Sequence, residues 1–208
     1  MSTIAPDYIA GRLTARDWYD LRDRLSADRT ELWQEAFADY FEERLRLRYL
    51  HQIRLLQENG TFQGEGFSIV AIQCSLIEFL ESTAKGTNYR YLRRGSVLGP
   101  FEYSSSKAVF VSFLTAHAPF SNAFDAASAE DFYEGVRCGL LHEARTKNGW
   151  RIWAKHGGDI VADPRNRIVY RDNFQEGLLT YIRNYGQRLL HDRELQAAFI
   201  RKFDSLCT

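Results

Sequence analysis

The sequence has few cysteines: Cys74, Cys138 and Cys207 are the only three, and they are far apart. No Cys-x-x-Cys pair and no cysteine–histidine cluster has the spacing of metal ligands, which argues against a zinc site. The pair Gly157-Gly158 lacks the strand-to-helix context of a phosphate-binding loop. We therefore expect reduced thiols, as in a cytoplasmic protein, with no metal and no cofactor.

The sequence also lacks an uninterrupted apolar run of about 18 residues, the length that a membrane-spanning helix needs. Its first residues, MSTIAPDYIAGRL, have no long apolar region behind a basic start, so they do not resemble a secretory signal. These two absences predict a soluble, intracellular chain that does not contact a membrane.

An excess of charge of one sign is missing as well. The chain has 27 lysines and arginines against 27 aspartates and glutamates, for a formal net charge of zero. No overall field attracts a polyanion, so any contact with nucleic acid must rest on a local patch. The run Tyr-Arg-Tyr-Leu-Arg-Arg at 89–94 interleaves stacking and phosphate-binding side chains. It predicts RNA contact through Arg90, Arg93 and Arg94, with an ordinary surface loop as the alternative.

What the sequence does contain is helical periodicity over most of its 208 residues. Apolar spacings and caps predict helices at 14–25, 30–57, 67–86, 104–118, 128–148, 172–190 and 192–205. We call the helix at 128–148 the motif helix, and we expect Ser128 to cap its start. Short β-branched and aromatic segments at 150–170 predict a small β-hairpin or three-stranded patch. The expected fold is mainly α, one domain over 1–208, with 1–13 as a flexible lead-in.

The most informative chemical feature is the pair Arg137 and His142 on the motif helix. Histidine can move a proton near neutral pH, and arginine can hold a phosphate and offset charge that develops on it. Five positions correspond to a rotation of about 140° on an ideal helix, so the two side chains flank one face. A two-fold partner helix would present each residue twice. A structural role for both residues, unrelated to chemistry, is the alternative.

These residues carry a family resemblance. The segment FYEGVRCGLLHEARTK at 132–147 resembles the signature helix of the HEPN superfamily, and SIVAIQCSLIEFLES resembles its earlier core helix. The resemblance implies an all-α HEPN-like bundle with an Arg-x4-His motif, acting as a homodimer. It also implies a metal-independent endoribonuclease of anti-phage defence or of a toxin–antitoxin system, with Arg137 and His142 catalytic. The partners implied are RNA and a cognate antitoxin or defence-system protein.

Several neighbours of the motif are candidate supporting residues. Cys138 occupies a position that is often Asn, Asp or His in active members of the family. Glu143 and Arg145 follow the histidine, and Lys147 is a further candidate for RNA contact, although basic groups are also favoured at any helix C-terminus. Glu78 lies on an apolar helix, where a buried acid needs a partner. Arg137 is an attractive one, although Glu78 could equally face solvent.

Three functional hypotheses follow. The first is a HEPN-type endoribonuclease that gives 2′,3′-cyclic phosphate and 5′-hydroxyl ends. The second is a non-catalytic HEPN-like module that binds RNA, a nucleotide or a protein, and Cys138 is its best support. The third is a helical scaffold unrelated to that family. Cleavage of RNA separates the first hypothesis from the other two.

Overall fold

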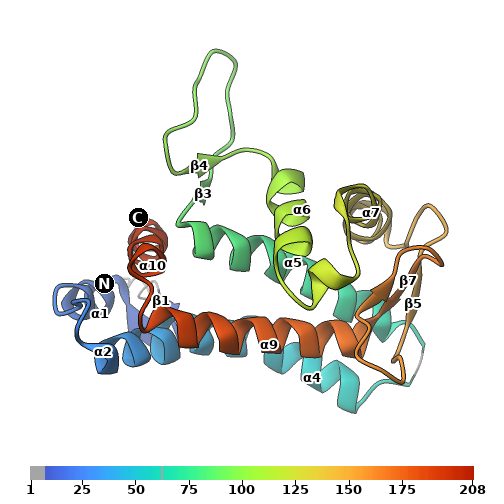
Figure 1. Ribbon diagram of the computed structural model, residues 1–208, viewed down its shortest axis with the longest axis horizontal. Coiled ribbons are helices and arrows are strands. Elements are labelled where there is room, and N and C mark those ends of the chain that lie inside the picture. Colours follow the sequence, from blue (N-terminus) through green and yellow to red (C-terminus); the bar gives the residue numbers. More distant parts are fainter. Residues whose placement is uncertain (1–7, 62) are drawn as a thin grey trace, which may run out of the picture. The chain divides into compact units, whose positions relative to one another are not determined.

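The computed structural model describes residues 8–61 and 63–208, and it is mainly helical (Figure 1). The chain forms two compact units, where the sequence indicated a single domain. Unit 1 contains the residues up to His51 together with Ser82–Ser104 and Asn184–Thr208, and unit 2 contains Gln52–Glu81 and Ser105–Arg183.

Unit 1 begins with a short strand pair that the sequence did not predict. Strands β1 (Tyr8–Ala10) and β2 (Leu13–Thr14) pair antiparallel, and Ile9 and Ala10 are buried. Arg44 donates to the backbone carbonyl of Ile9, and Arg48 donates to that of Tyr8 at 2.9 Å. The expected flexible lead-in over 1–13 is therefore wrong for residues 8–13, because these long-range bonds fix the strand; residues 1–7 lie outside the described part.

The helices of unit 1 follow the predicted ranges. Thr14 caps α1 (Ala15–Arg22), as expected. The predicted helix at 30–57 is present as consecutive segments, two of them π-helical: α2 (Thr30–Glu35), η1 (Ala36–Glu42), α3 (Glu43–Leu45), η2 (Arg46–Leu50) and α4 (His51–Glu58). Apart from His51, α4 belongs to unit 2. The chain ends with α10 (Arg193–Leu206), which Asp192 caps.

Aromatic rings fill the core of unit 1. Trp18 lies 5.1 Å from Tyr40 and 5.2 Å from Phe203, measured between ring centroids, and Phe199 lies 4.5 Å from Phe203. Each of these side chains is buried. Large rings in such mutual contact remove much apolar surface from water, which explains how a unit of this modest size holds together.

Unit 2 contains the motif helix and the β patch. Its helices include residues of α5 (Glu65–Lys85) and α9 (Arg171–Leu189), which both continue into the ranges of unit 1. The other elements are α6 (Ser106–Ala116), η3 (Phe120–Asn122), α7 (Ala126–Phe132), η4 (Tyr133–Cys138), α8 (Gly139–Glu143), β5 (Arg151–Trp153), β6 (Ala162–Asp163) and β7 (Ile168–Tyr170). The last two predicted helices, at 172–190 and 192–205, are confirmed.

The motif helix comprises α7, η4 and α8, and both of its predicted ends are wrong. Its cap is Asp125, which accepts from the Ser128 backbone N–H at 2.8 Å, while Ser128 supplies the reciprocal bond of a capping box. The helix stops at Glu143, because Ala144 adopts a left-handed conformation with φ of 53°. Lys147 therefore lies beyond the helix.

The segment after the motif helix folds back along it. The Lys147 backbone N–H donates to the Gly135 carbonyl at 2.6 Å, and Trp150 packs 5.0 Å from Phe132. A Cβ atom added at Gly135 would lie 2.6 Å from the Trp150 ring, and one at Gly139 would lie 2.5 Å from a backbone oxygen. The two glycines thus permit the close return of the chain.

The β patch has three strands in the order β5-β7-β6. Strand β6 pairs antiparallel with β7, but β5 pairs parallel with it. Of the two predicted arrangements, the three-stranded patch is correct and the simple hairpin is wrong.

One described helix, α5, is long and apolar enough to cross a membrane by length and composition. However, 56% of its most apolar window is buried inside the protein, as expected of the core helix of a globular unit.

Candidate functional site

Arg137 is held where three helical segments of unit 2 meet. It lies in the π-helical stretch η4, and its Nη2 atom is 3.8 Å from Oε2 of Glu78 on α5. Ser106, the first residue of α6, donates its hydroxyl to the other oxygen of Glu78 at 2.9 Å. Both charged side chains are half-buried. The contact expected between Glu78 and Arg137 is therefore present, and Ser106 joins it.

Tyr133 is a member of this site that sequence reasoning missed. The Arg137 guanidinium lies 5.3 Å from the centre of its ring, a cation–π distance. The Tyr133 hydroxyl also interacts with the thiol of Cys138, five positions along the chain. Burial raises the pKa of Tyr133, the Arg137 charge opposes this, and the Cys138 bond adds to it. The hydroxyl therefore stays protonated at neutral pH.

Cys138 has a packing environment rather than that of an activated nucleophile. It is only partly exposed, and its bond partner is the Tyr133 hydroxyl. Among the described residues, no hydrogen bond joins Cys138 to His142. These observations favour a role for Cys138 as a small packing residue.

His142 lies at the exposed end of the motif helix, in α8. Within the part of the chain that the structure describes, no hydrogen bond, ion pair or ring contact joins it to Arg137. The π-helical stretch ends at Cys138, so the turn from there to His142 is α-helical. Arg137 itself lies in the π-helical stretch, so the rotation of an ideal α-helix does not describe the whole step from Arg137 to His142.

The charged residues that follow His142 form their own surface cluster. Glu143 binds Arg145 at 3.0 Å and Lys147 at 2.7 Å. The Lys147 and Arg145 bonds lower the pKa of Glu143, which is exposed to solvent. Arg145 and Lys147 thus share the single carboxylate of Glu143, and this pairing competes with their binding to a phosphate.

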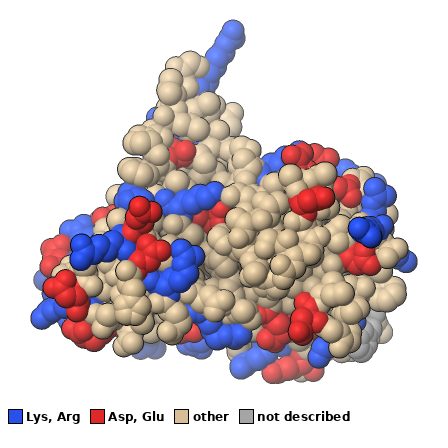
Figure 2. Space-filling model, viewed as in Figure 1, with Lys and Arg blue, Asp and Glu red and all other residues tan. Residues whose placement is uncertain are grey.

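The basic run at 89–94 lies in unit 1, in the long loop between β3 (Asn88–Tyr89) and β4 (Glu102–Tyr103) (Figure 1). Arg90 is paired with Glu102 at 2.8 Å, whereas Arg93 and Arg94 are exposed. Figure 2 shows basic atoms at the free end of this loop, over a surface with little acidic colour. Tyr91 and Val97 are exposed there as well. Two of the three arginines are therefore placed for contact with an anion.

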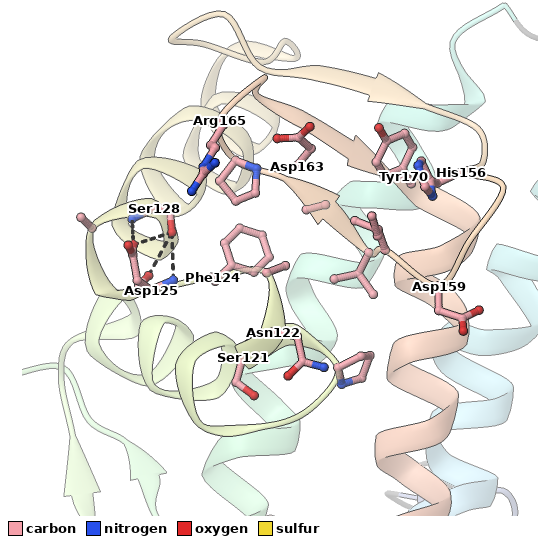
Figure 3. Close-up of a pocket in the computed structure, with 17 residues that line it drawn as sticks. Ser121, Asn122, Phe124, Asp125, Ser128, His156, Asp159, Asp163, Arg165 and Tyr170 are labelled. Carbon is pink, nitrogen blue, oxygen red and sulfur yellow. Dashed lines mark hydrogen bonds between the residues drawn. The ribbon is translucent and has the colours of Figure 1, made fainter.

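A cavity of about 980 Å³ lies elsewhere in unit 2, and none of the predicted site residues lines it (Figure 3). It opens between the 119–128 segment and the β patch, with the buried side chains of Phe124 and Tyr170 on its walls. Arg165, Asp159 and Asn122 supply polar groups at its edge. Its size suits a small organic molecule. No spacing in the sequence marks it, because its two walls are far apart along the chain.

A second buried polar cluster contains Glu81, His117 and Ser112. The Glu81 carboxylate is buried, accepts from the Ser112 hydroxyl at 2.7 Å and contacts Nε2 of His117 at 2.8 Å. His117 also packs 4.9 Å from Tyr181. The sequence offered no partner for this histidine, because Glu81 lies on a different helix. The cluster satisfies a buried acid.

Within residues 8–61 and 63–208, no group of three or more His, Cys, Asp or Glu side chains is arranged to hold a metal ion. Comparison with known proteins adds no relative: no family model, curated protein or solved structure matches the chain.

Proposed function

We propose that this chain is a metal-independent endoribonuclease of HEPN type, acting in the cytoplasm in anti-phage defence or in a toxin–antitoxin system. The resemblance of 132–147 to the family's signature helix is the starting point. The observation that carries the proposal is the setting of Arg137: a half-buried arginine on a π-helical stretch, held by Glu78 from another helix. π-Helical turns occur frequently at functional sites.

The proposed reaction is an attack of the RNA 2′-hydroxyl on the adjacent phosphorus. The 2′-oxygen–phosphorus bond forms, the bond to the 5′-oxygen breaks, and the products are a 2′,3′-cyclic phosphate and a 5′-hydroxyl. His142 takes the proton of the 2′-hydroxyl or donates one to the leaving oxygen. Arg137 stabilises the charge that accumulates on the phosphoryl oxygens. RNA supplies the nucleophile, so the protein needs to move a proton and offset charge.

A homodimer completes this site. Arg137 faces α5 and His142 is exposed, so a two-fold partner would place a second arginine and a second histidine at the same surface. Leu141, next to His142, is 62% exposed and offers an apolar side chain to the proposed interface. Sedimentation should show a dimer at micromolar concentration that Leu141→Asp dissociates. A wild-type monomer would count against this arrangement.

The experiment that tests the function uses purified protein and mixed cellular RNA, with and without EDTA. We expect cleavage in both, and product ends that carry cyclic phosphate and 5′-hydroxyl. Cleavage that EDTA abolishes would contradict the metal-independent route, and ends with a 3′-hydroxyl would contradict the proposed chemistry.

A non-catalytic binding module is the second candidate. The cavity of about 980 Å³ favours it, because its lining combines aromatic walls with one arginine, an amide and three aspartates and lies apart from Arg137 and His142. Under this alternative the chain binds RNA, a nucleotide or a protein and leaves RNA intact. The RNA assay above separates the two candidates.

A further inference from the structure

A small pocket lies where the first turns of two long helices approach strand β5 in unit 2. It has a volume of about 150 Å³ and is lined by residues 64–67 at the start of α5, by 152–154 and by Arg171 at the start of α9. Gly66 lies close to both neighbours: a Cβ atom there would make a tight contact with Ile152 at 3.3 Å and an ordinary one with Arg171 at 3.5 Å. The pocket is therefore formed by tight packing of secondary structure rather than by a loose loop.

Two aromatic side chains on the lining are unusually exposed. Phe67 is 42% exposed and Trp153 is 49% exposed, although phenylalanine and tryptophan are residue types that often lie in a core. The Arg151 guanidinium lies 5.9 Å from the centre of the Trp153 ring. Exposed rings beside a cation are the elements with which proteins bind single-stranded nucleic acid, because every base has a face that can stack.

The lining of the pocket includes two charged side chains. Arg171 binds Glu65 at 3.2 Å, and their side chains are only 7% and 10% exposed. A hydrocarbon ring would fit poorly against a buried guanidinium and carboxylate. A planar ring with polar edges fits better, because its faces can contact the aromatic side chains while its edge meets the ion pair.

We propose that this pocket, formed by Phe67, Trp153, Glu65 and Arg171, is a subsite for one nucleobase. This inference rests on the proposed function in one respect, namely that the base belongs to the RNA substrate. Phe67 and Glu78 lie on the same helix, and eleven residues at a rise of 1.5 Å separate them by about 16 Å. The base bound here would thus belong to a nucleotide a short distance along the strand from the phosphate at Arg137.

Nucleotide binding can be measured without cleavage, through the indole N–H resonances of the protein. The chain has four tryptophans, of which Trp18, Trp33 and Trp150 are buried, and Trp153→Phe identifies the remaining signal. Adding guanosine or adenosine 5′-monophosphate at millimolar concentrations should shift the Trp153 signal and leave the other three in place. Ribose 5-phosphate, which lacks a base, should shift none of them.

The affinity should depend on the Phe67 ring. Phe67→Ala should weaken nucleotide binding about tenfold, the usual size of the effect of removing one stacking partner. Phe67→Tyr, which keeps a ring, should restore binding. The matched control is Tyr8→Ala, which removes a similarly exposed ring from unit 1 and should change nothing.

The outcomes separate this inference from the proposed function. A Trp153 shift that depends on the base and on Phe67 supports the subsite even if the protein does not cleave RNA. No shift, a shift that ribose 5-phosphate reproduces, or affinity that Phe67→Ala leaves unchanged overturns the subsite even if RNA is cleaved.

Discussion

The Arg137 guanidinium reaches Glu78 on another helix, with 3.8 Å between Nη2 and Oε2, and Ser106 binds the opposite oxygen of the same carboxylate. A distance of this length leaves the arginine oriented by charge and not locked in a bidentate bond. Arg137 can therefore turn toward a phosphate while Glu78 still limits where its guanidinium lies.

The first prediction concerns this positioning. Glu78→Gln removes the charge that orients Arg137 and should lower kcat for RNA cleavage about tenfold, which corresponds to about 1.4 kcal/mol. The KM for RNA should change little, because Glu78 does not contact the substrate. The matched control is Glu134→Gln on the motif helix, where the glutamate pairs with Lys107 and should not affect kcat. Equal rates for Glu78→Gln and wild type would show that Glu78 does not position Arg137.

The second prediction concerns the loop between β3 and β4. Replacing Arg93 and Arg94 by Ala should weaken RNA binding and reduce its salt dependence, with a slope change of about 0.7 for each phosphate that is no longer bound. Arg90→Ala should have the smaller effect, because Glu102 already neutralises Arg90 at 2.8 Å. Binding measured at several salt concentrations checks this. Equal effects of all three arginines, or none, would contradict the placement that the structure indicates.

The third prediction concerns the return of the chain along the motif helix. Gly135→Ala would bring a Cβ atom to 2.6 Å from the Trp150 ring, closer than side-chain packing allows. The variant should unfold more easily, by about 1–3 kcal/mol, as expected for overpacking. Gly157→Ala is the control, because nothing lies within 4 Å of the added atom. Urea unfolding of both variants measures the difference, and equal stabilities would contradict the fold-back of 145–150.

The fourth prediction concerns acid. Bonds from the Ser128 side chain and backbone lower the pKa of Asp125 below its ordinary value of 3.8. The folded state thus favours the ionised cap, so its contribution is present above about pH 4 and is lost as pH falls through the lowered pKa. Asp125→Asn keeps a capping oxygen without the charge, so its stability should fall less over that range. Parallel curves of unfolding free energy against pH for the two proteins would contradict the assignment of Asp125 as the cap.

Much of the fold follows from patterns that the sequence displays directly. The apolar periodicity locates the helices, because burial of one face selects a period of 3.6 residues. The ends of the motif helix cannot be located from this periodicity. Asp125 and Ser128 are both good capping residues, and only the local geometry decides which one caps. The other end at Glu143 depends on Gly135 and Gly139, which admit a segment from farther along the chain.

The site was predictable where chemistry required a partner. Glu78 lies on an apolar helix, where an acid needs a partner if it is buried, and Arg137 is near it. Tyr133 could have been found, because it lies four positions before Arg137, the spacing at which side chains on a helix meet, but the π-helical stretch that holds both residues could not. The pocket beside Trp153 joins segments from three distant parts of the chain, so no local pattern marks it.

The central claim, that Arg137 and His142 together cleave RNA, is tested most directly by the rates of two single variants and the double variant. Arg137→Ala and His142→Ala should each reduce cleavage by at least about 100-fold, since loss of proton transfer alone commonly costs 10²–10⁴-fold. The double variant should be little slower than either single one, because the two residues act as a unit. The fold of each variant, monitored by circular dichroism, should be unchanged. Cleavage at wild-type rates in both single variants, with the fold intact, would contradict the account.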